Sequence, residues 1–300
     1  MIMSNLQTET ALNIEPIKTK SDHRFLQFWR LFRRKKPAVI SFYFVLFLFI
    51  MAIIGPFVTP FDAAKPDYNS VLETPSASHW FGTDEYGRDI LSRIIAGARI
   101  SLSVSVSAVT LGAIVGSILG LISGFFGKWV DKLIMRICDV LFAFPELILA
   151  IGIVAILGPG LNNVIIAVAF FSVPSFARIV RGATLEVKEM LFVEAEESLG
   201  ASRLRIMFKH VFPETLPTII VYYTMNVGTA ILAAASLSFL GLGAEPSSPD
   251  WGAMLSVSRD YIGTAFHLVF FPGLVIFLTV LAFNLLGDGL REMLDPKMKD

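Results

Sequence analysis

The sequence contains one cysteine, Cys138, and four histidines among its 300 residues. A single thiol excludes an intramolecular disulfide and any metal site built from paired cysteines, and the histidines lack the spacing of metal ligands. Neither charge is in excess, because 25 basic residues balance 25 acidic residues. The chain therefore lacks the basic signature of a nucleic-acid-binding protein, and no nucleic acid is expected among its partners.

A phosphate-binding loop is also missing. The nearest match to its pattern ends at Gly127-Lys128, but Ile122 replaces the upstream glycine and Trp129 replaces the Ser or Thr that would bind magnesium. We therefore expect no enzymatic activity and no cofactor in this chain. If ATP drives its function, ATP and magnesium must be bound by another subunit.

Long apolar segments are abundant. Hydrophobic residues make up 54% of the chain and the mean hydropathy is +0.67, as in membrane proteins. Six segments are long enough, or nearly so, to cross the hydrocarbon of a bilayer: 37–58, and about 100–126, 133–157, 164–180, 218–240 and 266–286. The predicted fold class is an all-α polytopic membrane protein with six transmembrane helices.

These spans divide the chain into an N-terminal tail, a first span, an outer loop with an interfacial helix, a five-span core and a C-terminal tail: 1–36, 37–58, 59–99, 100–290 and 291–300. The core includes a charged loop at 182–217. Twenty of the 25 basic residues lie in the tails, the 127–136 turn and the 178–216 loop, and five lie in the alternate loops. The positive-inside rule therefore places both termini and the charged loop in the cytoplasm.

The charged loop has the pattern of two short helices joined at Gly200. Each helix has one apolar face, formed by Phe192, Ala195 and Leu199 in the first and by Leu204, Phe208 and Val211 in the second. We expect Gly200 to end the first helix in a left-handed conformation and Ser202 to cap the second helix. Such an elbow between two membrane spans is suited to be pushed by a partner.

The elbow resembles the EAA loop of permease subunits in ABC importers. That pattern is Glu-Ala-Ala, then three residues and Gly, then nine residues and Ile-x-Leu-Pro, and it matches Glu194-Ala195, Gly200 and Pro213. The resemblance implies that the loop couples the permease to an ATPase through Glu194, Ala195, Gly200, Ala201, Ser202, Arg203, Leu204 and Pro213. The residues by themselves also allow an ordinary polar loop between two spans.

Two departures from the EAA pattern are visible. Glu196 replaces the second alanine, and His210-Val211-Phe212 replaces Ile-x-Leu. The Glu196 carboxylate is positioned to alter packing beside the elbow. Because alanine is the residue of the pattern, the substitution Glu196→Ala is expected to be mild.

The end of the first outer loop carries a longer motif. Residues 81–89 read Phe-Gly-Thr-Asp, two further residues, and Gly-Arg-Asp, which resembles the signature of one permease type in the dipeptide, oligopeptide and nickel importer family. We expect the following residues to form an amphipathic helix along the membrane surface, with Ile90, Leu91, Ile94 and Ile95 opposite Arg88 and Arg93. Residues 131–146, 241–255 and 284–296 also resemble this family.

Three spans contain residues that need an explanation. Gly112, Gly116, Gly120 and Gly124 form one stripe that allows close helix packing. Glu146 lies deep in the third span on the same face as Asp139. Glu146 is either a pathway residue facing a cationic part of the cargo, or a packing residue that a bend at Pro145 places at an inter-span hydrogen bond, with Asp139 paired to Arg136, Lys128 or Lys132 at the start of the helix. Asn226 and Tyr223 are pathway candidates in the fifth span, although close packing also explains its small residues.

The resemblance covers nearly the whole chain, from about residue 25 to residue 296. It implies a type I ABC importer permease fold in the bacterial inner membrane, and a peptide cargo such as dipeptides, oligopeptides or glutathione. The implied partners are a second homologous permease, two ATPase subunits, an extracytoplasmic substrate-binding protein and membrane lipid. Nickel import by the same family is an alternative.

Two other functional classes are less well matched. A membrane enzyme needs a nucleophile–base pair or a metal cluster within its spans, and the sequence shows neither. An ion-coupled secondary transporter often carries inverted repeats with broken helices, and no such repeat is visible.

The missing phosphate-binding loop generates a prediction. The purified chain should not hydrolyse ATP, whereas the complex with its ATPase subunits should. The measurement is phosphate release by the isolated chain in detergent. Turnover that persists after contaminating ATPases have been removed would contradict the prediction.

Overall fold

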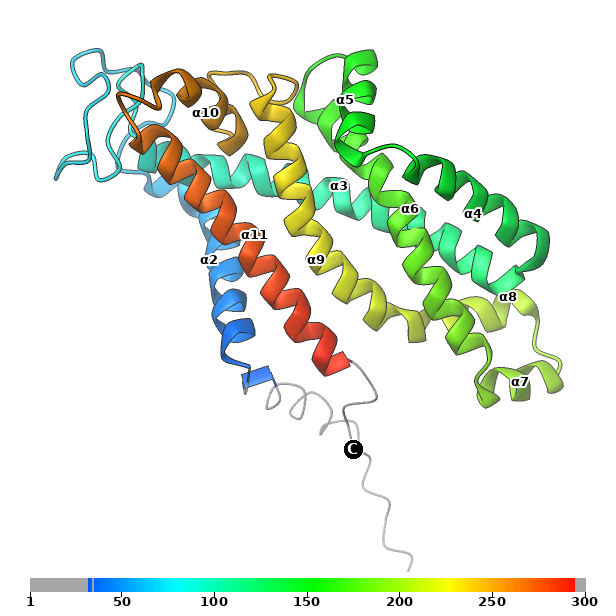
Figure 1. Cartoon of the computed structure of the whole chain (residues 1–300). Helices are drawn as coiled ribbons and strands as arrows, with labels where there is room; N and C mark the ends of the chain where they lie inside the picture. Colours follow the sequence, from blue (N-terminus) through cyan, green and yellow to red (C-terminus); the bar gives the residue numbers. More distant parts are fainter. Residues whose placement is uncertain (1–31, 34, 295–300) are drawn as a thin grey trace, which may run out of the picture.

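The computed structural model of the protein describes residues 32–33 and 35–294. Within these residues the regular elements are helices, and one isolated bridge joins Thr83 to Asp89 (Figure 1). The helices are α2 (Lys36–Val58), α3 (Ile90–Phe126), α4 (Lys128–Phe142), α5 (Glu146–Leu157), α6 (Leu161–Lys188), α7 (Leu191–Ser198), α8 (Arg203–Ile206), the π-turn η1 (Met207–Val211), α9 (Phe212–Phe239), α10 (Trp251–Ser258), the 3-10 turn η2 (Arg259–Tyr261) and α11 (His267–Leu294).

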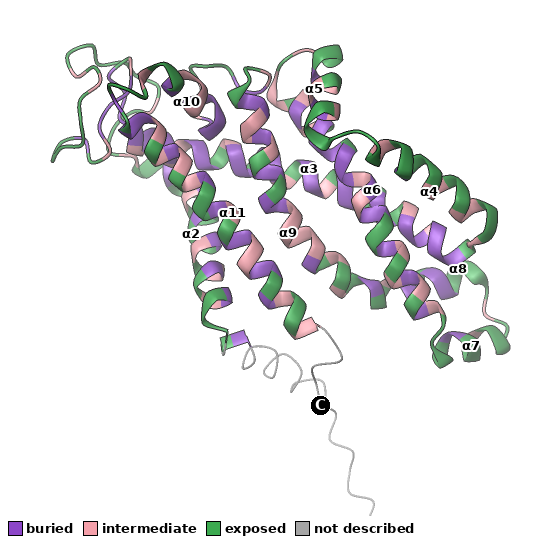
Figure 2. Cartoon of the chain, viewed as in Figure 1, coloured by how far each residue is buried: buried purple, intermediate pink, exposed green. Residues whose placement is uncertain are grey.

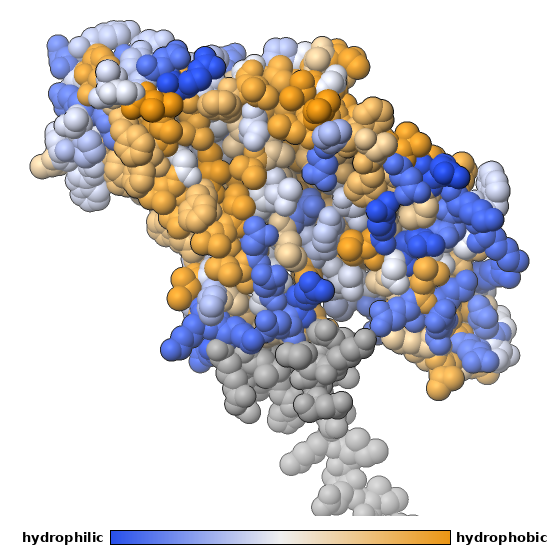
Figure 3. Space-filling view, in the orientation of Figure 1, coloured by the Kyte–Doolittle hydropathy of each residue, from blue (hydrophilic) through white to orange (hydrophobic). Residues whose placement is uncertain are grey.

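The prediction of six membrane spans is confirmed. Five helices are long and apolar enough to cross a membrane, and a sixth span is obtained if α4 and α5 are counted as one broken span. Figure 3 shows a broad apolar area over the middle of one face, with hydrophilic areas near the loop at 59–89 and near α7. The N-terminal tail at 1–36 lies almost entirely outside the described residues, as does the end of the C-terminal tail.

The third span is a broken helix, and the bend that one of the two interpretations of the sequence places at Pro145 is present. Its two halves, α4 and α5, are bent by 89° at residues 143–145. Pro145 explains the break, because proline lacks the N–H of the helical ladder and disfavours helical geometry in the residue before it. Glu146 therefore begins a new helix, and the prediction that it shares a helical face with Asp139 is wrong.

Ion pairs attach α4 to α6. Arg181 donates to Asp131 with an Nη2–Oδ2 distance of 2.7 Å, and Arg178 donates to Asp139 with an Nη2–Oδ1 distance of 2.8 Å. The predicted alternative, in which Asp139 pairs with Arg136, Lys128 or Lys132 of its own helix, is thus wrong. The partners come from the next span, about 40 to 50 residues away in the sequence.

The glycine stripe of α3 packs against α6 within this subunit. A Cβ atom at Gly116 would lie 2.5 Å from Phe176 Cβ, and one at Gly120 would lie 2.5 Å from Ala177 O. Neither distance leaves room for a side chain, so glycine allows the two backbones to approach closely. Figure 2 shows the resulting buried residues along α3, α6 and α9, whereas α4 is largely exposed.

Helices α2 and α11 pack beside each other at the edge of the bundle (Figure 1). A Cβ atom at Gly289 would lie 2.4 Å from the Cβ of Ala38, and Lys35 forms an ion pair with Glu292. The described chain therefore begins and ends at the same end of the bundle. The loop at 59–89 lies at the opposite end, together with α10.

Candidate functional site

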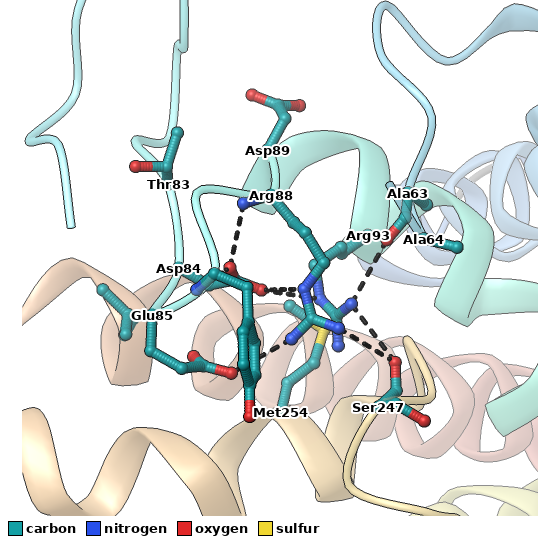
Figure 4. A network of polar contacts seen from close by, with 12 residues as sticks. Ala63, Ala64, Thr83, Asp84, Glu85, Arg88, Asp89, Arg93, Ser247 and Met254 are labelled. Atoms are coloured by element: carbon teal, nitrogen blue, oxygen red, sulfur yellow. Dashed lines mark hydrogen bonds and ion pairs between the residues drawn. The ribbon is translucent and has the colours of Figure 1, made fainter. Parts of the chain in front are cut away.

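The motif at residues 81–89 forms a buried charge network (Figure 4). Asp84 Oδ2 accepts from Arg88 Nε at 2.7 Å, and Asp84 Oδ1 accepts from the Arg88 backbone N–H at 2.9 Å. Arg88 Nη2 also donates to Glu85 at 3.0 Å. Burial raises the pKa of Glu85 above its ordinary value, and the neighbouring Asp84 charge acts in the same direction. The charges of the motif are therefore paired inside the protein.

Arg93 connects this network to the rest of the fold. Its side chain is only 2% exposed, and Nη2 donates to the carbonyl of Ser248 at 3.0 Å while Nη1 reaches the carbonyls of Ala63 and Ser247. Arg93 Nε lies 3.3 Å from Asp84 Oδ2 but makes no hydrogen bond, so this contact is an ion pair only. Arg93 thus fastens the loop at 59–89 to the loop before α10.

The prediction of an amphipathic helix along the membrane surface is therefore wrong. Residue 90 begins the single long helix α3, and both Ile94 and Arg93 are buried rather than lying on opposite apolar and polar faces. Asp89 caps this helix, because its Oδ2 accepts from the N–H of Ser92 at 2.8 Å, while its Oδ1 lies 3.0 Å from His79 Nδ1. Arg88 and Arg93 are paired with partners inside the protein, so the helix does not need a polar face that exposes them to water.

The elbow has the predicted turn at Gly200. Its φ is +78°, the N–H of Gly200 donates to the carbonyl of Glu197 at 3.0 Å, and the N–H of Ala201 donates to the carbonyl of Glu196 at 3.1 Å. These two bonds form a Schellman motif, which ends α7 and requires the left-handed conformation. Ser202 then caps α8 by accepting from the N–H of Arg205 at 3.4 Å, as predicted.

The second arm of the elbow differs from the prediction. Only one turn of α8 forms before η1, which then continues into α9 with Pro213 in its first turn. Leu204 and Phe208 are more than half exposed, whereas Val211 is buried. The predicted apolar face is therefore split, because the wider π-turn rotates the residues that follow it relative to α8.

A separate apolar cluster attaches the elbow to the spans. It contains Leu121 and Phe125 of α3, Val180 and Val187 of α6, Val193 of α7, and Ile206, Met207 and Val211 of the second arm. This cluster is distinct from the main core of the bundle. Other apolar side chains of the elbow remain exposed: Leu191, Phe192, Leu199, Leu204 and Phe208.

Two of the three pathway candidates meet at one hollow. A polar hollow of about 210 Å³ lies between α5, α6 and α9, and it is lined by Glu146, Phe171, Ser172, Ser175, Tyr222, Asn226 and Thr229. The Glu146 carboxylate makes no hydrogen bond or ion pair with residues 32–33 or 35–294. Asn226 Nδ2 is 3.4 Å from the Tyr222 hydroxyl.

Tyr223 does not line this hollow. Its hydroxyl lies 2.9 Å from Thr110 Oγ1 of α3, so the side chain joins two helices instead. Tyr222 occupies the position that the sequence analysis gave to Tyr223, and Ser172 and Ser175 of α6 were not identified. Adjacent residues of a helix point about 100° apart, which explains why the choice between two tyrosines needed the structure.

Comparisons with known proteins agree with this geometry. Residues 116–300 match the family model described as "Binding-protein-dependent transport system inner membrane component", and residues 24–75 match "N-terminal TM domain of oligopeptide transport permease C". The chain belongs to the first of these families. It is thus a multi-pass membrane protein of the permease type.

The curated relatives match this permease along its entire length. It is 52% identical over 302 residues to the glutathione transport system permease protein GsiD of Escherichia coli O6:K15:H31, and 53% identical to GsiD of Salmonella typhimurium, with 100% of both chains covered in each case. The solved MetNI methionine ABC transporter in an inward-facing conformation shares the fold. Its TM-score is 0.58 at 21% identity, covering 68% of this chain and 97% of that chain.

The buried network at the loop end of the permease generates a prediction. Asp84→Asn removes the carboxylate that pairs with Arg88 and Arg93, and breaking a buried ion pair in this way typically costs about 3–5 kcal/mol. The melting temperature of the detergent-solubilised protein and its amount in the membrane should both fall.

Asp62→Asn is the matched control, because Asp62 is exposed on the same loop and, among the residues that the structure describes, its carboxylate accepts only from the N–H of Ala64. Exposed substitutions of this kind usually change stability by less than about 0.5 kcal/mol. Equal stability of the two variants would show that the network does not hold the loop.

Proposed function

We propose that this chain is one permease subunit of an ABC importer that carries glutathione or related small peptides across a bacterial inner membrane. The full-length similarity to permeases named for glutathione transport carries the proposal. The match to an oligopeptide permease domain supports the same class of cargo. These comparisons favour a peptide over nickel as the cargo.

The proposed complex contains a second homologous permease, two ATPase subunits that bind ATP and magnesium, and an extracytoplasmic substrate-binding protein. Helices α4 and α5 leave an apolar surface uncovered in this subunit, including Leu133, Ile137, Val140 and Ile148. Part of such a surface is suited to lipid and part to a second permease. The exposed apolar side chains of the elbow are suited to a soluble ATPase.

The proposed orientation places both termini and the elbow in the cytoplasm. The distribution of lysine and arginine supports it, with twenty of these residues on that side and five on the other. The loop at 59–89 then faces outward, where a binding protein delivers cargo. Its buried charge network gives that protein a rigid surface to meet.

Coupling is proposed to run through the elbow. An ATPase that closes on ATP would displace α7, and the second apolar cluster connects α7 with α3, α6 and the start of α9. Glu194, Ala195, Gly200, Ala201, Ser202, Arg203, Leu204 and Pro213 are the proposed coupling residues. The importer would alternate between two states, and ATP would shift their populations through different contacts in each.

The cargo pathway is proposed to pass the hollow between α5, α6 and α9. Glu146 and Asn226 line it, and Glu146 is exposed in this subunit. A carboxylate in a membrane-spanning segment is costly unless it faces water, a partner or a ligand. The ammonium group or a basic side chain of a peptide has the complementary charge. Tyr223 is left out of this proposal because it bonds to α3.

Gly200→Val tests the coupling role of the elbow. A Cβ atom at Gly200 would meet no atom within 4 Å, so the substitution acts only through the positive φ. A β-branched residue in the left-handed region costs on the order of 1–2 kcal/mol. The reconstituted complex should therefore import labelled glutathione at a much lower rate per ATP hydrolysed, with the protein still present at its normal level.

Two matched variants distinguish the effect of the positive φ at Gly200 from the effect of the added side-chain volume. Gly182→Val adds the same side chain in open space within α6, where φ is not positive, and should be mild. Gly200→Asn should also be mild, because asparagine tolerates the left-handed region. Normal coupling in Gly200→Val, or a defect explained entirely by loss of protein, would remove the elbow from the proposed mechanism.

Glu146→Gln tests the pathway. A hydrogen bond to a charged group contributes roughly 1.5–3 kcal/mol, so import of basic peptides should fall by about tenfold or more relative to acidic peptides. Uptake of basic, neutral and acidic peptides by the assembled complex is the measurement. Glu189→Gln, at an exposed carboxylate outside the hollow, is the control. Unchanged selectivity among the three classes would leave Glu146 with a packing role.

A further inference from the structure

The two residues at which the elbow departs most from the EAA pattern lie beside each other. His210 Nε2 is 3.6 Å from Glu196 Oε1. Glu196 belongs to α7 and His210 belongs to η1, so the contact bridges the two arms of the elbow. The side chains are about one-third and one-fifth exposed, and the contact therefore lies at the edge of the protein interior.

The contact between Glu196 and His210 is not a hydrogen bond. At 3.6 Å it is too long for a hydrogen bond, and His210 Nε2 is buried without a hydrogen-bond partner among the described residues. A buried polar atom without a partner is unfavourable. A movement of α7 toward η1 by on the order of half an ångström would complete the bond, so movement in that direction is favoured and movement away is not.

Both residues are attached firmly to the elements that the proposed coupling would displace. The backbone carbonyl of Glu196 accepts from Ala201 in the turn at Gly200, so any change of that turn displaces Glu196. His210 lies in η1, which continues without interruption into the membrane-spanning helix α9. The π-turn is itself a local widening of a helix, a feature found frequently at functional sites.

We propose that Glu196 and His210 are positioning residues that transmit the displacement of α7 to α9. This inference rests on the proposed coupling function of the elbow. The apolar cluster around Val193 also joins the two arms, but apolar contacts are non-directional and tolerate a range of angles. A hydrogen bond between a carboxylate and an imidazole is directional, so it sets the angle between the arms. The contact therefore reverses the expectation that Glu196→Ala is mild.

The test uses the complete importer in proteoliposomes, with its ATPases and binding protein. Labelled glutathione imported per ATP hydrolysed is measured together with the amount of assembled complex. Glu196→Ala and His210→Phe each remove one partner and should each lower this ratio about fivefold, the effect of one hydrogen bond. The double variant should be no worse than either single variant, because both remove the same interaction.

Two further variants distinguish positioning from general stability. His210→Gln retains an N–H donor that can reach Glu196 and should restore most of the ratio. Glu197→Ala removes the neighbouring exposed carboxylate and should leave the ratio unchanged. Unaltered ratios in both single variants, independent effects that multiply in the double variant, or losses that follow the amount of complex would overturn the inference.

Failure of the inference and failure of the proposed function give different results. If Gly200→Val lowers import per ATP while Glu196→Ala and His210→Phe do not, the elbow couples transport and only the inference is overturned. If Gly200→Val leaves the ratio normal, the proposed function of the elbow is overturned, and the inference with it.

Discussion

The close contact between α3 and α6 is the interaction on which the other parts of the structure depend. In lipid the hydrophobic effect does not drive one helix against another, so helices associate through close packing and polar contacts. The four glycines of α3 provide that close approach over slightly more than three turns. Because α3 carries the charge network at its first residues and Leu121 and Phe125 of the elbow cluster near its last, it connects the two ends of the molecule.

These two ends are held by different forces, which suits different roles. At the loop end, Arg88 and Arg93 are held by several directional bonds to carboxylates and backbone carbonyls, and any displacement would leave buried charges unpaired. At the elbow, α7 is attached through Val193, one turn at Gly200 and a contact that is not yet a hydrogen bond. The first arrangement resists movement, whereas the second allows it at small cost. The proposed function uses both, because a binding protein would meet a rigid surface and an ATPase would displace a movable elbow.

The sequence predicts the number of spans well, because length and hydropathy are local properties. It indicates a bend at Pro145 only in one of two alternatives, and it does not show how sharply each proline bends its span. Pro174, Pro217 and Pro272 lie inside continuous helices, whereas Pro145 stands at an 89° bend. Neighbouring helices can compensate the missing hydrogen bond of a proline in a membrane span, and that compensation depends on tertiary contacts. For the same reason the burial of Arg93 could not be predicted, since two of its three carbonyl partners lie more than 150 residues further along the chain.

In the candidate site, the sequence predicts the backbone conformation at positions where one residue determines it. It predicts side-chain contacts between two separate segments less well. Gly200 and Ser202 have the conformations expected of them, because a helix end needs a residue that tolerates positive φ and a helix start needs a side-chain acceptor. Glu196 and His210 each looked like an isolated departure from a pattern. Fourteen residues separate them, and only the turn at Gly200 together with the π-turn brings the two side chains to 3.6 Å. A single residue that differs from the EAA pattern indicates that its position tolerates substitution. Two such residues in contact with each other indicate an interaction that the EAA pattern does not contain.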